Sequence, residues 1–440
     1  MALIVQKFGG TSMGSADRIR NAALRAIAAH AAGDRVVVIV SAMSGETDRL
    51  LRLARDIRAV AAEGRETELT VAAIAAAGRE LDALAATGEQ VSAALMALAI
   101  QELGGRARSF VGHQLKMLTD SAFTKARIKT IEGTRVLEAV MAGDIAVVAG
   151  FQGVDDKGDI TTLGRGGSDT SAVAVAAALG ADVCEIFTDV DGVYTTDPNI
   201  CPSARKIDKI SYEEMLELAS LGAKVLQIRS VELAMKYQVP IHVRTSFSNA
   251  EGTLVTNEAS LEEVVVTGVA YDKNEARVMF VGVEDRPGIV AQIFGDLASE
   301  NVSVDMIIQN ASKLSDNDTL RTDVTFTVAK SDLQKVRAVI DGIAKNVGAV
   351  EVRYDEDIVK VSIVGLGMRS HAGVAAKMFR ILADHAVNIQ AISTSEIKVS
   401  CLVAAKYTEL VVRALHDGFG LAGPAADPAP EAAAADAANR

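Results

Sequence analysis

Short apolar runs rich in β-branched residues alternate with longer segments rich in alanine and leucine through the first half of the chain. The short runs predict strands and the longer segments predict helices, because strands are the shorter elements and favour β-branched residues. Predicted strands span residues 3–8, 36–41, 145–151, 185–188 and 240–244, and predicted helices span 16–32, 50–62, 88–103 and 169–179. This alternation predicts an α/β fold whose mostly parallel sheet carries helices on both faces.

The pattern changes near residue 250, where a turn is followed by an acidic connector. Beyond it the chain repeats itself, since residues 277–282, 287–291 and 301–304 parallel 360–365, 372–376 and 386–389. Each copy has the pattern strand, glycine-containing loop, amphipathic helix and further strands, which predicts two α+β modules. We expect an α/β domain over 1–248, a linker over 249–264, two duplicated domains over 265–348 and 349–418, and a disordered Ala- and Pro-rich tail over 419–440.

Composition narrows the class of protein. A chain of 440 residues suggests about three domains. The net charge of −12 argues against nucleic acid or an anionic membrane as a partner. The three cysteines lie far apart, so we expect neither disulfides nor a zinc site, and a cytoplasmic location fits. No basic and apolar leader and no long uninterrupted apolar run is present, so we expect no secretion signal and no membrane span.

Two glycine-rich turns carry the candidate chemistry. Residues 7–12 read Lys-Phe-Gly-Gly-Thr-Ser, and residues 162–169 read Thr-Leu-Gly-Arg-Gly-Gly-Ser-Asp. Each turn follows an extended apolar run and precedes a predicted helix, where exposed N–H groups and the helix dipole favour an anion. Lys7 adds a point charge suited to phosphate, and Arg165 adds a planar fork suited to a carboxylate. The pair of turns suggests phosphoryl transfer to a carboxylic acid.

The first turn closely resembles the N-terminal signature of the aspartate kinases, within the amino-acid kinase family. Further matches follow in the expected order at residues 41–43, 87–89, 164–169, 188–198, 222–225 and 229–232. The resemblance covers about residues 2–418. One departure is Gln90, since the common Gly-Glu-Arg is Gly88-Glu89-Gln90 here and a positive charge near the site is lost.

The resemblance implies roles for the matched residues. Lys7 matches the lysine that contacts the transferring phosphate, Glu89 the glutamate that meets the substrate ammonium group, and Arg165 the arginine that grips a substrate carboxylate. The implied catalytic residues are Lys7, Glu89 and Asp169. The implied substrate-binding residues are Ser41, Thr47, Glu89, Arg165, Gly166, Gly167 and Ser168. The implied nucleotide-binding residues are Lys7, Phe8, Gly9, Gly10, Ser41, Ser168, Thr188, Asp189, Tyr194, Thr195, Thr196, Asp197, Pro198 and Lys224.

The chemistry implied by this resemblance needs no general base, because a carboxylate nucleophile is already an anion at pH 7. None of the six histidines lies in a matched motif, in agreement with that expectation. For Ser168 and Asp169 simple capping of the following helix is an alternative role. ATP with Mg²⁺ is the implied cofactor, and no dedicated protein ligands for a metal are predicted.

The duplicated modules look like ACT domains, which bind amino acids where the first strand turns into its helix. The implied effector residues are Asp285, Gly288, Ile289, Ser303, Val304, Asp305, Gln309, Val374, Ala375, Asn388, Ile389, Ser395 and Glu396. A duplicated structural module without a ligand is the alternative. ACT pairs in this family bind lysine, threonine or both and mediate dimerisation, so the resemblance implies feedback control and a homodimer. A heterotetramer with a separately initiated regulatory subunit is the alternative assembly.

The resemblance thus implies a monofunctional aspartate kinase that makes 4-phospho-L-aspartate, the first step towards lysine, threonine and methionine. Acetylglutamate, glutamate, carbamate and uridylate kinases share the glycine pair but lack the doubled tail. A sensor that kept its ACT pair and lost activity is a further alternative, against which Lys7, Arg165 and Asp169 argue.

Overall fold

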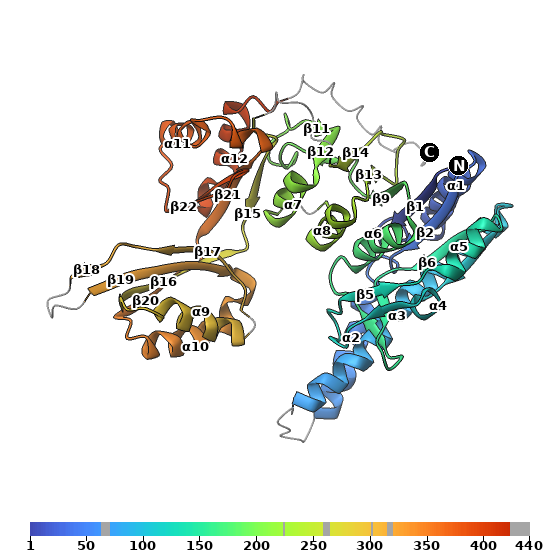
Figure 1. The fold of residues 1–440 in the computed structure, drawn as a ribbon, viewed down its shortest axis with the longest axis horizontal. Coiled ribbons are helices and arrows are strands. Elements are labelled where there is room, and N and C mark those ends of the chain that lie inside the picture. Colours follow the sequence, from blue (N-terminus) through green and yellow to red (C-terminus); the bar gives the residue numbers. More distant parts are fainter. Residues whose placement is uncertain (63–70, 223–224, 258–264, 301, 315–319, 423–440) are drawn as a thin grey trace, which may run out of the picture. The chain divides into compact units, whose positions relative to one another are not determined.

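The computed structural model describes residues 1–62, 71–222, 225–257, 265–300, 302–314 and 320–422 (Figure 1). The chain forms two compact units. The N-terminal unit comprises residues 1–194, 206–220 and 224–261, and the C-terminal unit comprises residues 195–205, 221–223 and the chain from 262 onward.

An eight-stranded sheet forms the centre of the N-terminal unit. Its strand order is β12-β14-β13-β9-β1-β2-β6-β3, and every neighbouring pair is parallel except β13 with β14. The bounds are β1 (Leu3–Phe8), β2 (Arg35–Val40), β3 (Ala107–Phe110), β6 (Ile145–Ala149), β9 (Val183–Thr188), β12 (Lys209–Ser211), β13 (Ile241–Thr245) and β14 (Thr253–Thr256). The predicted mostly parallel sheet is confirmed.

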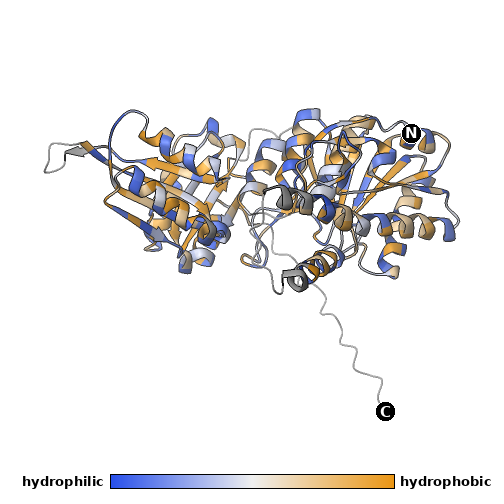
Figure 2. Ribbon diagram, turned by 90° about the horizontal axis from the view of Figure 1, so that it is seen from below, coloured by the Kyte–Doolittle hydropathy of each residue, from blue (hydrophilic) through white to orange (hydrophobic). Residues whose placement is uncertain are grey.

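Helices cover this sheet because both of its faces are apolar. Val36, Val38 and Val40 of β2 form one core cluster with residues of α1 (Ala16–Ala31) and α3 (Val71–Glu102). Val37 and Ile39 alternate with them, so they face the other side, and they are equally buried. Helix α6 (Gly167–Leu179) packs on β1, β2 and β9. Figure 2 shows the hydrophobic residues concentrated on the strands and inner helix faces.

The remaining elements of the unit flank this sheet. A small sheet has the order β5-β4-β7-β8, and β10 pairs with β11. The bounds are α2 (Glu46–Ala62), α4 (Gly112–Leu115), β4 (Met117–Thr119), β5 (Ile128–Ile131), α5 (Thr134–Met141), β7 (Gln152–Val154), β8 (Ile160–Thr162), β10 (Val193–Tyr194), β11 (Lys206–Ile207), α7 (Tyr212–Ser220) and α8 (Ile228–Tyr237).

One helix among the described residues, Ala77–Glu102 within α3, is long and apolar enough to cross a membrane by length and composition alone. Half of its most apolar stretch is buried inside the protein. Ala93, Met96 and Ile100 of this helix belong to the core cluster shared with α1 and the sheet. Its apolar composition is therefore explained by packing inside the unit.

Two sheets make up most of the C-terminal unit. One has the order β17-β19-β16-β20 with β18 paired to β19, and the other has the order β15-β21-β23-β22. Their bounds are β15 (Gly268–Asp272), β16 (Glu275–Glu284), β17 (Val304–Gln309), β18 (Lys313–Leu314), β19 (Leu320–Ala329), β20 (Glu351–Asp355), β21 (Ile358–Val364), β22 (Ala391–Thr394) and β23 (Lys398–Ala404). The helices are α9 (Ile289–Ser299), α10 (Lys330–Asn346), α11 (Val374–Asp384) and α12 (Thr408–Gly418), with short 3-10 turns at Leu366–Arg369 and Ala405–Tyr407.

The predicted repeat corresponds to two similar halves. Helices α9 and α11 have the same length, and each follows a glycine, Gly288 or Gly373, with a φ of 93°. Each helix packs its apolar face on its own sheet, in separate core clusters. The halves also exchange strands, because β15 pairs with β21 of the second copy and β20 pairs with β16 of the first.

Several boundaries differ from the sequence prediction. Strand β14 belongs to the large sheet, although residues 249–264 were expected to be a linker. The expected division at 348 is crossed by two strands. Strand β15 precedes it but pairs in the sheet of the second copy, and β20 follows it but pairs in the sheet of the first copy. Leu421 is buried in the core of the second copy, so the start of the expected tail is packed. The rest of that tail, from 423, lies outside the described residues.

Candidate active site

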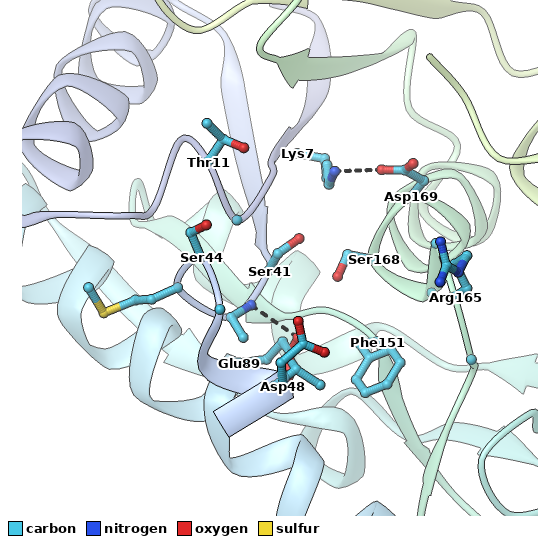
Figure 3. Close-up of a pocket in the computed structure, with 18 residues that line it drawn as sticks. Lys7, Thr11, Ser41, Ser44, Asp48, Glu89, Phe151, Arg165, Ser168 and Asp169 are labelled. Carbon is cyan, nitrogen blue, oxygen red and sulfur yellow. Dashed lines mark hydrogen bonds and ion pairs between the residues drawn. The ribbon is translucent and has the colours of Figure 1, made fainter. Parts of the chain in front are cut away.

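A pocket of about 380 Å³ lies at the carboxyl ends of β1, β2 and β6, beside the start of α6 (Figure 3). Ligands of parallel α/β sheets bind at this edge. Both predicted glycine-rich turns reach the pocket. Its lining residues are Lys7, Gly10, Thr11, Ser41, Ala42, Met43, Ser44, Gly45, Thr47, Asp48, Glu89, Phe151, Gly164, Arg165, Gly166, Gly167, Ser168 and Asp169.

The end of β1 supplies a buried cation. Lys7 Nζ lies 2.6 Å from Asp169 Oδ1, and both residues are only 9% exposed. The Oδ1 atom has no aligned hydrogen bond, so the contact is an ion pair. Asp169 lies in the first turn of α6, where the helix dipole also favours an anion. Figure 3 shows the two side chains facing each other at the edge of the pocket.

The loop before α6 places Arg165 at the pocket. Gly166 caps the helix with a φ of 68°, and a Cβ there would lie 1.8 Å from the Gln227 side chain, so only glycine fits. Arg165 is exposed, and its side chain forms no hydrogen bond or ion pair with the described residues. A planar guanidinium held at a pocket in this way is free to receive a carboxylate.

Glu89 is the buried acid of the pocket. It lies on α3, is 3% exposed, and its Oε1 accepts a hydrogen bond of 3.0 Å from the Ala42 N–H. Its Oε2 is buried without a hydrogen-bond partner in the described structure. Burial raises the pKa of Glu89 to about 7, and the Ala42 hydrogen bond only partly offsets this. An ammonium group at Oε2 would satisfy both the orphaned oxygen and the charge.

The hydroxyl groups of Ser41, Thr47 and Ser168 complete the lining. The structure also adds residues that the sequence interpretation did not single out for the site. Outside the matched motifs these are Ser44, Gly45, Asp48 and Phe151, and within the motifs, where no role had been given to them, they are Thr11, Ala42, Met43 and Gly164. Phe151 has a φ of 67°, an uncommon conformation for a bulky residue, and its ring packs against Gly167. Strand β6 consequently ends at Ala149, before the predicted end at 151.

The predicted nucleotide residues divide into groups. Lys7, Gly10, Ser41 and Ser168 line the pocket, whereas the Phe8 ring is buried and stacks on Phe187 at 4.8 Å. Thr188 ends β9, Asp189 follows it and Tyr194 lies on β10, and none of the three lines this pocket. Thr188 donates to Asp189, and Tyr194 donates to Asp191 at 3.0 Å. Lys224 lies outside the described residues.

Residues 195–198 belong to the C-terminal unit, although they were expected to bind the nucleotide. Thr195 and Thr196 are buried, and Thr195 Oγ1 lies 2.9 Å from His416 Nε2. The Tyr271 hydroxyl donates to Asp197 at 2.9 Å. Within the described residues, these side chains therefore make contacts inside the C-terminal unit.

Cys201 Sγ and His416 Nδ1 lie 3.4 Å apart, close to the Asp417 carboxylate, so these three residues group donors that metal sites use. The spacing of the cysteines predicted no zinc site. Burial lowers the pKa of His416 below its ordinary value. Its Nε2 contacts Thr195, and its Nδ1 contacts Cys201 and lies 3.7 Å from Asp417 Oδ1, so both ring nitrogens already have neighbours among the described residues.

The predicted effector residues are spread over the two ACT-like halves. Asp285 accepts a hydrogen bond from Ser312, Glu396 pairs with Arg369 at 3.0 Å, and Asp305 pairs with Lys360. Ile289 is buried in a core cluster, while Val374, Ala375 and Ile389 pack against the other. The remaining predicted effector residues, Gly288, Ser303, Val304, Gln309, Asn388 and Ser395, lie on the loops, strands and helix starts around them.

Comparison with known proteins agrees with this organisation. The amino acid kinase family model matches residues 2–245, and two ACT domain models match residues 277–344 and 361–419. Aspartate kinase Ask_LysC of Stutzerimonas stutzeri is 53% identical over 98% of this chain and 100% of its own length. The aspartokinase of Pseudomonas aeruginosa is also 53% identical, over 97% of this chain and 99% of its own.

Solved structures give the same result. Escherichia coli aspartokinase III in complex with aspartate and ADP (R-state) is 28% identical, with a TM-score of 0.76 over 94% of this chain and 99% of that one. The same enzyme with lysine and aspartate (T-state) has a TM-score of 0.72 at 27% identity, over 95% of this chain and 99% of that one. The chain therefore belongs to the amino acid kinase family and, within it, to the aspartokinases that carry two ACT domains.

Proposed function

We propose that the enzyme transfers the γ-phosphoryl group of ATP to the β-carboxylate of L-aspartate and releases 4-phospho-L-aspartate, which feeds lysine, threonine and methionine synthesis. The observation that carries the proposal is the pairing of a free guanidinium, Arg165, with a buried acid that lacks a partner at one oxygen, Glu89, in a single pocket. An amino acid presents one carboxylate and one ammonium group to such a pair. The β-carboxylate then remains for the reaction.

Aspartate binding would use opposite charges at the two ends of the substrate. The Arg165 fork receives the α-carboxylate, and Glu89 Oε2 receives the α-ammonium. Ser41, Thr47 and Ser168 offer hydroxyls to the substrate, and Gly166 and Gly167 allow its close approach. Because the nucleophile is already ionised, the enzyme accelerates the reaction mainly by positioning the β-carboxylate at the γ-phosphorus, and no proton transfer is needed.

The phosphates would lie at Lys7 and the start of α6. Lys7 stabilises the charge that develops on the transferring group, and Asp169 holds the ammonium in place through the ion pair. Among the pocket acids, Asp169 pairs with Lys7, and Glu89 accepts from Ala42 with one oxygen while its other oxygen is assigned to the substrate ammonium. Mg²⁺ fits this site as an ion carried by the ATP phosphates and water, with Asp48 as the exposed pocket carboxylate.

Feedback control would act through the ACT pair, with lysine, threonine or both as effectors. Helices α9 and α11 start at equivalent loops, which offer N–H groups to an effector carboxylate. Asp285 and Glu396 are the acids suited to its ammonium. A related structure contains lysine and aspartate. We further propose a cytoplasmic homodimer assembled through the ACT domains, with a heterotetramer containing a separate regulatory subunit as the alternative.

Trapping the product tests this function directly. The purified enzyme is incubated with ATP, Mg²⁺, aspartate and hydroxylamine, which converts an acyl phosphate into a hydroxamate. Liquid chromatography against the two synthetic standards, with detection by mass, then separates the β-hydroxamate of aspartate from the α-isomer. We expect the β-isomer, formed at the same rate as ADP. Formation of the α-isomer, or ADP release without a hydroxamate, would contradict the proposal.

A further inference from the structure

A second acid of α3 is buried against the loop that carries Arg165. Asp82 is 1% exposed, although its charged neighbours Arg79 and Glu80 on the same helix form exposed ion pairs. Its Oδ2 accepts hydrogen bonds from the Thr162 N–H at 2.7 Å and the Thr124 N–H at 2.8 Å. Its Oδ1 accepts one from the Thr162 hydroxyl at 2.7 Å. A buried carboxylate that receives three donors fixes the backbone on which those donors lie.

The two segments held by Asp82 both lie next to Gly164, the residue before Arg165. Thr162 precedes Gly164 by two residues, and the Thr124 carbonyl lies against Gly164, where a Cβ would approach it to 3.1 Å. Thr124 has a φ of 69°, so its backbone needs support from its neighbours. The Ala126 N–H also donates to the Thr162 carbonyl at 2.8 Å. Asp82 therefore sets where the Arg165 loop begins.

Glu89 and Asp82 lie on the same face of helix α3. Glu89 follows Asp82 by seven residues, which is two helical turns or about 10.5 Å on the same face. Glu89 holds the Ala42 N–H on one side of the pocket, and Asp82 holds the Thr162 loop on the other. One rigid helix thereby fixes the spacing between the two groups that receive an amino acid.

We propose that Asp82 is a positioning residue for aspartate binding, which acts by holding the Thr162–Gly164 backbone so that Arg165 faces Glu89 across the pocket. This proposal rests on the assignment of Arg165 to the substrate carboxylate. Asp82 does not line the pocket and contacts no reacting atom. A change at Asp82 should therefore alter KM for aspartate and leave KM for ATP unchanged.

Asp155 offers a matched control in the same unit. It is 3% exposed, and its carboxylate also receives three donors, from the Lys157 and Asp159 N–H groups and the Ser121 hydroxyl. Two of those donors belong to the turn between β7 and β8, and Ser121 belongs to the β4–β5 loop that also carries Thr124, but none belongs to the Thr162–Gly164 backbone. Asp82→Asn and Asp155→Asn make the same chemical change, replacing an acceptor oxygen by an amide donor. Only the first lies against the Arg165 loop.

Steady-state kinetics of both variants, with melting temperatures, separate positioning from stability. We expect Asp82→Asn to raise KM for aspartate about 10-fold or more with KM for ATP within about two-fold of wild type. Asp155→Asn leaves both values within two-fold. Equal changes in the two KM values of Asp82→Asn, no change, or the same aspartate effect in Asp155→Asn would each overturn the proposal.

Thr162 provides a milder pair of variants if Asp82→Asn does not fold. Thr162→Val removes the hydroxyl that donates to Asp82, whereas Thr162→Ser keeps it. We expect the valine variant to raise KM for aspartate and the serine variant to resemble wild type. Equal values in these two variants would contradict the proposal.

Arg165→Ala identifies which assignment fails. If Arg165→Ala leaves KM for aspartate unchanged, Arg165 does not bind the substrate and the inference about Asp82 falls with it. If Arg165→Ala raises that KM and Asp82→Asn does not, only the positioning role is wrong. In the double variant, Asp82→Asn should add little to Arg165→Ala, because both act through one contact.

Discussion

Lys7 at the end of β1 and Asp169 in the first turn of α6 form an ion pair at 2.6 Å, with both residues only 9% exposed. The pair joins two elements that are far apart in sequence and adjacent at the carboxyl edge of the sheet. A lysine that is buried and paired is already oriented before a phosphate arrives, which reduces the reorganisation needed during transfer.

Lys7→Ala should lower kcat by roughly 10²–10³, equivalent to about 3–4 kcal/mol, because charge on the moving phosphoryl group loses its cation. We also expect a lower melting temperature, since Asp169 is left buried without its partner. Lys116→Ala is the control, because Lys116 forms an exposed pair with Glu132 at 2.7 Å. A folded Lys7→Ala enzyme with near-normal kcat would show that Lys7 is not at the phosphoryl group.

Arg165→Lys should reduce kcat/KM for aspartate by about 2–5 kcal/mol, since an ammonium cannot reproduce a bidentate grip. KM for ATP should change little, because the substitution leaves both Lys7 and the backbone N–H groups at the start of α6 in place. Arg20→Lys on the exposed side of α1 makes the same change away from the pocket. Loss of ATP affinity with aspartate use retained would mean that the two anion sites are assigned the wrong way round.

The pH dependence of aspartate use should follow Glu89, whose pKa burial raises to about 7. Only the ionised carboxylate pairs with an ammonium group, so kcat/KM for aspartate should rise with pH and level off above about pH 7. In Glu89→Gln the rise through pH 7 should disappear together with most of the aspartate affinity. The exposed Glu138→Gln on α5 should keep the wild-type profile, and a pH rise that survives in Glu89→Gln would assign it to another group.

The stability of the folded protein should also depend on the protonation of Glu89. It should fall as pH rises, whereas aspartate use should rise. A raised pKa means that the folded state binds the proton more tightly than the unfolded state does. The stability that protonated Glu89 contributes is thus present below the ordinary value of 4.5 and is lost as pH rises to about 7. At pH 8 we expect Glu89→Gln to melt at a higher temperature than wild type. At pH 4 the difference should be smaller.

The sequence predicted those parts of the fold and site that depend on local pattern. Strand β1 has the predicted bounds, and Lys7, Arg165 and Asp169 lie at the pocket as their glycine-rich turns suggested. Asp82 gave no comparable signal, because an acid beside other charged residues of a helix reads as solvent-exposed until its buried partners are known. Phe151 was missed for a similar reason, since its positive φ depends on tertiary packing.

Longer-range pairing could not be inferred from local pattern either. The exchange of β15 and β20 between the two ACT sheets depends on partners that lie far along the chain. Thr195 matched a nucleotide-binding motif, and its contact with His416, more than two hundred residues later, became apparent only in the structure.

Feedback inhibition should weaken in Asp285→Ala and in Glu396→Lys, because each change removes an acid from an ACT loop proposed to hold an effector ammonium. Activity without effector should stay close to wild type. The coupling free energy between effector binding and inhibition that is lost should be about 1–3 kcal/mol. Inhibition curves for lysine, threonine and both together provide the measurement. Glu300→Lys, an exposed charge reversal after α9, is the control. Unchanged inhibition in both variants would place the effector elsewhere.

A crystal structure of the enzyme with aspartate and a non-hydrolysable ATP analogue tests the central claim most directly. The account predicts the aspartate α-carboxylate on the Arg165 guanidinium, its ammonium on Glu89, and the γ-phosphate beside Lys7 with the β-carboxylate in line. Aspartate bound outside this pocket, or its ammonium directed away from Glu89, would contradict it.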